Sequence, residues 1–143
     1  MPTRTADATW EGDLRDGNGT VALGSGAYEG AYSFGSRFED ADGTNPEELI
    51  GAAEAGCFAM ALANALDDGG FTPERIHATA SVHLDADDLS IDEISLIVEG
   101  RVPDASRAEF LEYAIDAKEN CPVSKALTGP NIGLSVEEFE GAD

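Results

Sequence analysis

Apolar residues gather most densely in one stretch of the chain, from Asn45 to Gly70. Asn45 is suited to cap a helix, Pro46 to fill its first position, and Glu48 to bond back to the cap. Gly69 and Gly70 can take the left-handed conformation that ends a helix. Between these ends the apolar residues leave no face of the helix consistently polar, so the pattern predicts a helix that is buried on nearly every side. Its apolar residues are Leu49, Ile50, Ala52, Ala53, Ala55, Phe58, Met60, Leu62 and Leu66.

Shorter apolar runs on both sides of this helix predict strands. Extended segments are expected over residues 4–14, 19–24, 28–38, 74–85 and 90–102. Asp16-Gly17-Asn18-Gly19 is a strong signal for a hairpin turn between the first two. In the fourth segment the apolar face consists of Ile76, Ala78, Ala80, Val82 and Leu84. The fifth has a mixed pattern that indicates partial burial on both faces.

Two helical segments and a last strand are expected in the remainder of the chain. Ser106 and Glu109 form a capping box for a helix, and its apolar stripe is Phe110, Leu111, Ala114, Ile115 and Ala117. Pro122 interrupts that helix, and a short helical turn follows. A strand over 132–136 precedes an acidic tail, from Glu137, that is expected to fray. This order of elements predicts a single α+β domain over residues 1–143 with a mainly antiparallel sheet.

The chain is strongly acidic, with 8 Lys and Arg against 29 Asp and Glu and a formal net charge of −21. Such a surface repels phosphate backbones and anionic membranes, so neither nucleic acid nor a membrane is an expected partner. The apolar stretch is also interrupted by Glu54 and too short to span a bilayer, and no signal peptide is recognisable. Because the carboxylates are dispersed over almost every segment, we expect a cytoplasmic protein of a halophilic cell.

Cys57, near the middle of the apolar helix, is either an inert core residue or a functional thiol. Cysteine is among the most buried residue types, so Cys57 is explained by inert core packing. Against this, Glu54 places a carboxylate on the same face of an apolar helix. Gly51 and Gly56 weaken the helix and suggest that another element approaches closely, which plain helix packing also explains.

The second thiol and the histidines also have ordinary explanations. Cys121 precedes Pro122 at a cap-like position where free helix amides would favour a thiolate, or it is a plain cysteine at a helix break. The two cysteines lie 64 positions apart and match no zinc-binding spacing. His77 and His83 share one face of a strand about 20 Å apart, so they cannot bind one metal ion and are expected on a solvated face.

Arg37 and Glu47 are candidate site residues, and the distance from Glu47 to Cys57 limits how they could share one site. Arg37 is explained by a surface ion pair with Glu39 or Asp40, and Glu47 by the helix dipole. Glu47 and Cys57 lie about 15 Å apart along one straight helix. A site that used both would therefore need a second chain, or Glu47 would act through Arg37. The residues alone indicate a small acidic α+β protein with two thiols of uncertain role.

Several short motifs are distributed over nearly the whole chain. They are Trp10-Glu11-Gly12-Asp13, Gly19-Thr20-Val21, Ser36-Arg37-Phe38-Glu39, the stretch from Thr44 to Ala53, the stretch from Cys57 to Leu62, Gly70-Phe71-Thr72-Pro73 and Cys121-Pro122-Val123-Ser124. Together they closely resemble the OsmC/Ohr family (osmotically inducible protein C and organic hydroperoxide resistance protein), and the arginine motif resembles its OsmC branch. Two cysteine motifs at this separation make the resemblance highly specific.

The resemblance implies a thiol-dependent peroxidase that reduces organic hydroperoxides. The implied fold packs antiparallel sheets around a buried central helix in an intertwined homodimer, with the sites at the interface. By position, Cys57 would be the peroxidatic cysteine and Cys121 the resolving one. Arg37 would hold the Cys57 thiolate and orient the peroxide, and Glu47 would pair with Arg37.

The implied chemistry passes through a Cys57 sulfenic acid and a Cys57–Cys121 disulfide, which a dithiol donor then reduces. The usual donor of the family is a lipoylated protein, and no metal or flavin is required. Phe58 and Met60 would line an apolar substrate pocket. Relatives often carry an aromatic or imidazole side chain in place of Glu54, which we expect to point away from the sulfur. The alternative is a thiol redox sensor or a stress-induced binding protein without efficient turnover.

Overall fold

The computed structural model describes residues 2–129 and 131–142, and the chain divides into two compact units after Leu49. The first unit contains β1 (Ala6–Glu11), β2 (Asn18–Leu23), β3 (Glu29–Tyr32), α1 (Phe34–Phe38) and the first turn of α2 (Pro46–Asp68). The second contains the rest of α2, β4 (Arg75–Asp85), β5 (Ser90–Val102), α3 (Arg107–Asn120), α4 (Pro122–Ala126) and β6 (Asn131–Gly141). The expected α+β class is confirmed, whereas the single domain stays a prediction.

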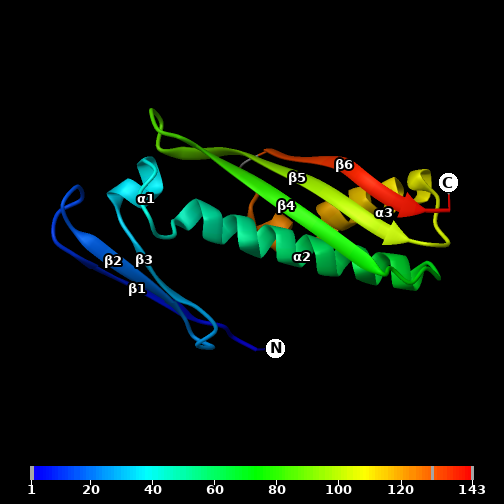
Figure 1. Ribbon diagram of the computed structural model, residues 1–143, viewed down its shortest axis with the longest axis horizontal. Helices are drawn as coiled ribbons and strands as arrows, with labels where there is room; N and C mark the ends of the chain where they lie inside the picture. The colour runs from blue at the N-terminus through cyan, green and yellow to red at the C-terminus, as the bar shows by residue number, and fades with distance from the viewer. Residues whose placement is uncertain (1, 130, 143) are drawn as a thin grey trace. The chain divides into compact units, whose positions relative to one another are not determined.

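The first unit is an antiparallel sheet in the order β1-β2-β3, followed by a short helix (Figure 1). The hairpin turn lies earlier than predicted: the Gly17 N–H donates to the Asp13 carbonyl at 3.0 Å, and β2 has already begun at Asn18. The extended segment expected over 28–38 is wrong beyond β3, because Ser33 starts α1. Ser33 and Ser36 form a reciprocal capping box that satisfies the first free amides of the helix.

Hydrogen bonds within the first unit join α1 to the start of α2. As predicted, Asn45 caps α2: its Oδ1 accepts from the Glu48 N–H at 2.7 Å. The Glu48 carboxylate accepts from the Thr44 hydroxyl instead of bonding back to the cap. The Ser36 hydroxyl donates to the Thr44 carbonyl at 2.7 Å, and the Asn45 amide donates to the Ser36 carbonyl at 3.1 Å. The last turn of α1 is therefore held beside the first turn of α2.

The second unit has a sheet in the order β4-β5-β6, shown green to red in Figure 1. β4 and β5 match their predicted ranges and pair antiparallel, but β5 and β6 pair parallel. The crossover through α3 and α4 returns the chain to the same end of the sheet, which a parallel pair requires. β6 also continues to Gly141, so the expected frayed tail is wrong. Its backbone pairs with β5 as far as Val102 opposite Gly141.

The core of the second unit lies between its sheet and the two longer helices, which run along one face (Figure 1). Burial alternates along β5, so one face of that strand is buried. The buried cluster consists of Phe58, Leu62, Leu66, Leu96, Val98, Val102, Ala105, Phe110, Ala114 and Ala117. The α3 stripe is narrower than predicted, because Leu111 and Ile115 are exposed.

One face of α2 is buried and the opposite face is exposed. Gly51 lies against β4, where a Cβ would meet the Ala80 carbonyl oxygen at 3.4 Å, so the expected close approach exists at this glycine. Gly56 has no such neighbour, and Met60 is 76% exposed. The prediction that α2 is buried on nearly every side is therefore wrong for a single chain.

α2 is long and apolar enough, by length and composition, to cross a membrane, so the length argument against a membrane helix is wrong. The core helix of a soluble domain passes the same test. α2 places Phe58, Leu62 and Leu66 in the protein core with no exposed surface. It also buries Glu54 completely, and a carboxylate is costly inside a bilayer.

Candidate active site

Arg37 and Glu47 form a two-point ion pair in the first unit. The guanidinium Nε donates to Oε1 at 3.0 Å and its terminal nitrogen donates to Oε2 at 2.8 Å. The Glu47 side chain is 10% exposed and that of Arg37 is 37% exposed. Arg37 therefore bonds to Glu47 and not, as a surface ion pair would, to Glu39 or Asp40. This fork geometry fixes the guanidinium in one orientation and leaves part of it open to a ligand.

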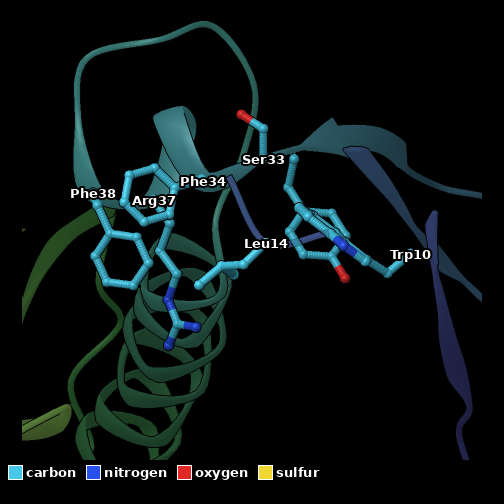
Figure 2. A pocket seen from close by; sticks show the side chains of 7 residues that line it. Trp10, Leu14, Ser33, Phe34, Arg37 and Phe38 are labelled. Carbon is cyan, nitrogen blue, oxygen red and sulfur yellow. The ribbon is translucent and has the colours of Figure 1, made fainter. Parts of the chain in front are cut away.

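Arg37 lies on the wall of an aromatic pocket of about 310 Å³ in the first unit (Figure 2). Its guanidinium carbon sits 5.4 Å from the centre of the Phe38 ring. The lining residues are Trp10, Leu14, Tyr32, Ser33, Phe34, Arg37 and Phe38. The pocket combines one cation with apolar walls, which suits a ligand that has an anionic or polar oxygen and a hydrocarbon body.

The expected pocket lining is wrong for Phe58. Phe58 is completely buried in the core, and Met60 is 76% exposed. The sequence pattern does not reveal the aromatic residues of the first unit, because it predicts an extended segment over 28–38. In a helix, Phe34, Arg37 and Phe38 fall at the spacing that shares one face. The signal that would have found them is the Ser33 to Ser36 capping pattern.

The Cys57 and Cys121 side chains lie close enough to interact in the second unit, and both are free thiols. Cys57 is partly exposed on α2, whereas Cys121 is completely buried. Cys121 closes α3 and caps α4, so its cap position is as predicted. Its side chain makes no capping hydrogen bond, however, and the Val123 backbone amide bonds to the Cys57 sulfur instead.

The surroundings of Cys57 within the second unit favour the thiol over the thiolate. Burial, above all, raises the pKa of Cys57 above its ordinary value of 9.0. The side-chain interaction with Cys121 also raises this pKa, and the charges of Cys121 and Glu54 add to it. The Val123 amide opposes the shift by donating to the sulfur. Cys57 therefore needs a cation before it becomes a strong nucleophile at neutral pH.

Glu54 does not point away from the thiols, so this expectation is wrong. It is completely buried, and its Oε1 accepts from the Ser124 hydroxyl at 2.6 Å. The other carboxylate oxygen, Oε2, is buried and has no hydrogen-bond partner among the residues that the structure describes. The expectation rested on the pKa of Cys57, which a carboxylate facing the sulfur would raise. Because Ser124 lies on α4, this partner became visible only in the folded chain.

Both histidines lie in the second unit. His77 and His83 lie on the exposed face of β4, as expected. His83 Nδ1 is 2.7 Å from the Asp92 carboxylate. Within residues 2–129 and 131–142, no three His, Cys, Asp or Glu side chains are grouped so as to hold a metal ion.

Comparisons with known proteins agree on one family. The family model described as OsmC-like protein matches residues 39–137. Peroxiredoxin OsmC of Escherichia coli is 46% identical over 127 residues, covering 87% of this chain and 89% of that protein. Organic hydroperoxide resistance protein-like 1 of Staphylococcus epidermidis is 34% identical over 71% of this chain and 76% of its own. The crystal structure of the organic hydroperoxide resistance protein OhrB of Bacillus subtilis matches with a TM-score of 0.69 and 26% identity, covering 93% of this chain and 98% of that one.

Proposed function

Because the chain belongs to the OsmC-like protein family, we propose that it is a thiol-dependent peroxidase of the stress response that reduces organic hydroperoxides to alcohols. The observation that carries the proposal is the closeness of Cys57 and Cys121, two free thiols whose side chains interact. The names of the relatives, a peroxiredoxin and organic hydroperoxide resistance proteins, support the same reaction class.

In the first step the Cys57 thiolate attacks the peroxide. The S–O bond forms as the O–O bond breaks, which leaves a sulfenic acid on Cys57 and an alkoxide that takes up a proton to become the alcohol. Arg37 would stabilise the thiolate and the departing oxygen. The aromatic pocket beside it would hold the hydrocarbon part of the substrate, which favours organic hydroperoxides over hydrogen peroxide.

Arg37 and Cys57 would meet across two copies of the chain. Glu47 fixes Arg37, and Glu47 and Cys57 lie ten positions apart on one helix. The exposed face of α2 supports an intertwined homodimer, because Ala52, Ala53 and Gly56 allow another backbone to approach closely and Met60 is 76% exposed. We propose a second copy as the occupant of this face, with Arg37 of one copy serving Cys57 of the other.

The cycle would close with a disulfide and a dithiol. Cys121 attacks the sulfenic sulfur of Cys57, the S–O bond breaks, and water leaves. A dithiol donor such as a lipoylated protein would then reduce the disulfide by thiol exchange and become oxidised itself. We place this cycle in the cytoplasm, where such donors keep cysteines reduced.

Thiol counting and intact mass test the function directly. Reduced protein in concentrated KCl is mixed with one equivalent of cumene hydroperoxide, beside a Cys57→Ser control. Loss of both thiols with a drop of about 2 Da is expected in the wild type only. Survival of both thiols would contradict the peroxidase function. Oxidation that no dithiol donor turns into repeated cycles would identify a redox sensor instead.

A further inference from the structure

Two neighbouring side-chain contacts join α2 to the start of α4. Ser124 Oγ donates to Glu54 Oε1 at 2.6 Å, and the Cys57 side chain interacts with that of Cys121. Glu54 and Cys57 are three residues apart on α2, and Cys121 and Ser124 are three residues apart at α4. Because residues at this spacing are neighbours on a helix face, the two contacts form adjacent links between the same two segments.

The Glu54–Ser124 link lowers the stability of the fold relative to a nonpolar contact, which argues that the link has a role other than stability. Glu54 has no exposed surface, and its Oε2 has no hydrogen-bond partner within the described part of the chain. A buried carboxylate oxygen without a partner costs free energy that a nonpolar side chain of similar volume would not. α4 spans only five residues, and a helix this short does not hold its own position.

We propose that Glu54 is a positioning residue that acts through Ser124 to keep Cys121 beside Cys57, so that the disulfide closes rapidly. This inference rests on the proposed function, because it concerns the step after peroxide attack. In that step the S–S bond forms between Cys121 and the Cys57 sulfenic acid as the S–O bond breaks. The Cys121 proton leaves with the hydroxide as water, so no further oxidant is needed. Peroxide attack itself uses the Cys57 sulfur and not that of Cys121, and it should not slow when the link is lost, because Cys121 and Glu54 both raise the pKa of Cys57.

Three variants separate the hydrogen bond from the charge and from the fold. Ser124→Ala removes the donor and leaves the Glu54 carboxylate without any partner. Glu54→Gln keeps an oxygen that accepts from Ser124 but removes the charge. The double variant Glu54→Met with Ser124→Ala replaces both partners by apolar groups, a change that is often nearly neutral for stability. It therefore removes the link without leaving a buried polar atom.

The first readout is the equilibrium of the Cys57–Cys121 dithiol with oxidised glutathione, which forms the disulfide and two reduced glutathiones without any peroxide. The equilibrium constant for closure should fall about tenfold or more in Ser124→Ala and in the double variant, and by less than about threefold in Glu54→Gln. The second readout is a single turnover with cumene hydroperoxide. Sulfenic acid, trapped with dimedone, should accumulate in the two variants without the link, while its rate of formation falls by no more than about twofold. The double variant also loses the Glu54 charge that raises the pKa of Cys57, so its rate of formation should equal or exceed that of wild type.

Closure constants equal to wild type in both variants without the link would overturn the proposal. Equal slowing of sulfenic acid formation and of closure would also overturn it, because that result indicates a general structural role. If Cys57 of the wild type fails to react with hydroperoxide while the glutathione equilibrium responds as expected, the positioning role stands and the proposed peroxidase function fails.

Discussion

Cys57 carries a conflict between its proposed role and its immediate surroundings. A nucleophilic sulfur must be a thiolate, yet burial, the Cys121 thiol and the Glu54 charge raise the pKa of Cys57. The Val123 amide is the one opposing contribution, and a single neutral donor is weak against these. Arg37 would resolve the conflict, because Glu47 holds its charge in a fixed orientation beside an apolar pocket.

Arg37→Ala should lower the rate of sulfenic acid formation by about 100-fold or more, because it removes the cation that stabilises the thiolate and the departing oxygen. The pKa of Cys57, followed by thiolate absorbance at 240 nm, should be higher in the variant than in wild type. Arg15→Ala is the matched control. Arg15 stacks over Phe34 at 4.7 Å in the same unit and lies outside the pocket lining. Equal rates in Arg37→Ala and wild type would remove Arg37 from the site.

His83 should titrate above its ordinary pKa of 6.5. Its hydrogen bond to Asp92 is the main cause, followed by the charges of Asp92, Asp85 and Glu93, all of which favour the protonated ring. Since the folded-state pKa is raised, this pair stabilises the fold below about pH 6.5, and the stabilisation is lost as the pH rises through the folded pKa. NMR titration of the ring protons measures the shift, and Asp92→Asn should reduce it. A wild-type pKa at or below 6.5 would contradict this assignment.

At the scale of elements, the sequence predicted those helix ends and strand pairs that depend on neighbouring residues. The ends of α2, the β4–β5 pair and the Ser106 cap of α3 follow from residues that lie within a few positions of one another. α1 was missed because five residues are too few to show a helical period. The parallel pairing of β6 was missed because it depends on where α3 and α4 return the chain.

In the candidate site, too, the sequence predicted some residues, whereas other contacts appear only in the folded chain. The motifs around Arg37, Glu47, Cys57 and Cys121 drew attention to these residues in the sequence, and the structure brings them together as two pairs. The Ser124 partner of Glu54 lies 70 positions away, so no sequence spacing predicts it. Similarly, the exposed face of α2 could not be distinguished from its buried face, because both consist of apolar and small residues.

Met60→Glu tests the exposed face of α2. A charge at this position should turn the proposed dimer into a monomer, because burying an unpaired carboxylate between two copies is unfavourable. Peroxide reactivity should fall with it. Leu89→Glu is the matched control, since Leu89 is 70% exposed in the turn between β4 and β5. Light scattering after size exclusion gives the mass. A dimer that persists in Met60→Glu would place the interface elsewhere.

At the scale of the whole molecule, charge is the dominant property. A formal charge of −21 on 143 residues makes the compact state repel itself at low ionic strength. The histidine and arginine pairs offset only part of this, because 8 Lys and Arg face 29 Asp and Glu. Stability should therefore depend on salt more than it does for a protein of balanced charge.

The melting temperature should rise by several degrees between about 0.1 M and about 1 M KCl, where the screening length falls from about 10 Å to about 3 Å. Most of the rise should be complete by about 1 M, because screening saturates while preferential exclusion of salt does not. Circular dichroism melts over a KCl series measure it. A melting temperature that is flat or falling over this range would contradict the high-salt adaptation.

The most direct test of a thiol peroxidase built from two chains is complementation between two inactive variants. Arg37→Ala and Cys57→Ser are unfolded together, refolded as a mixture, and assayed with cumene hydroperoxide and a dithiol donor, beside each variant refolded alone. If Arg37 of one copy serves Cys57 of the other, the mixed dimer holds one intact site, and the mixture should recover about one quarter of wild-type activity. A mixture as inactive as its components, although mixed dimers form, would show that the two residues do not act across the interface.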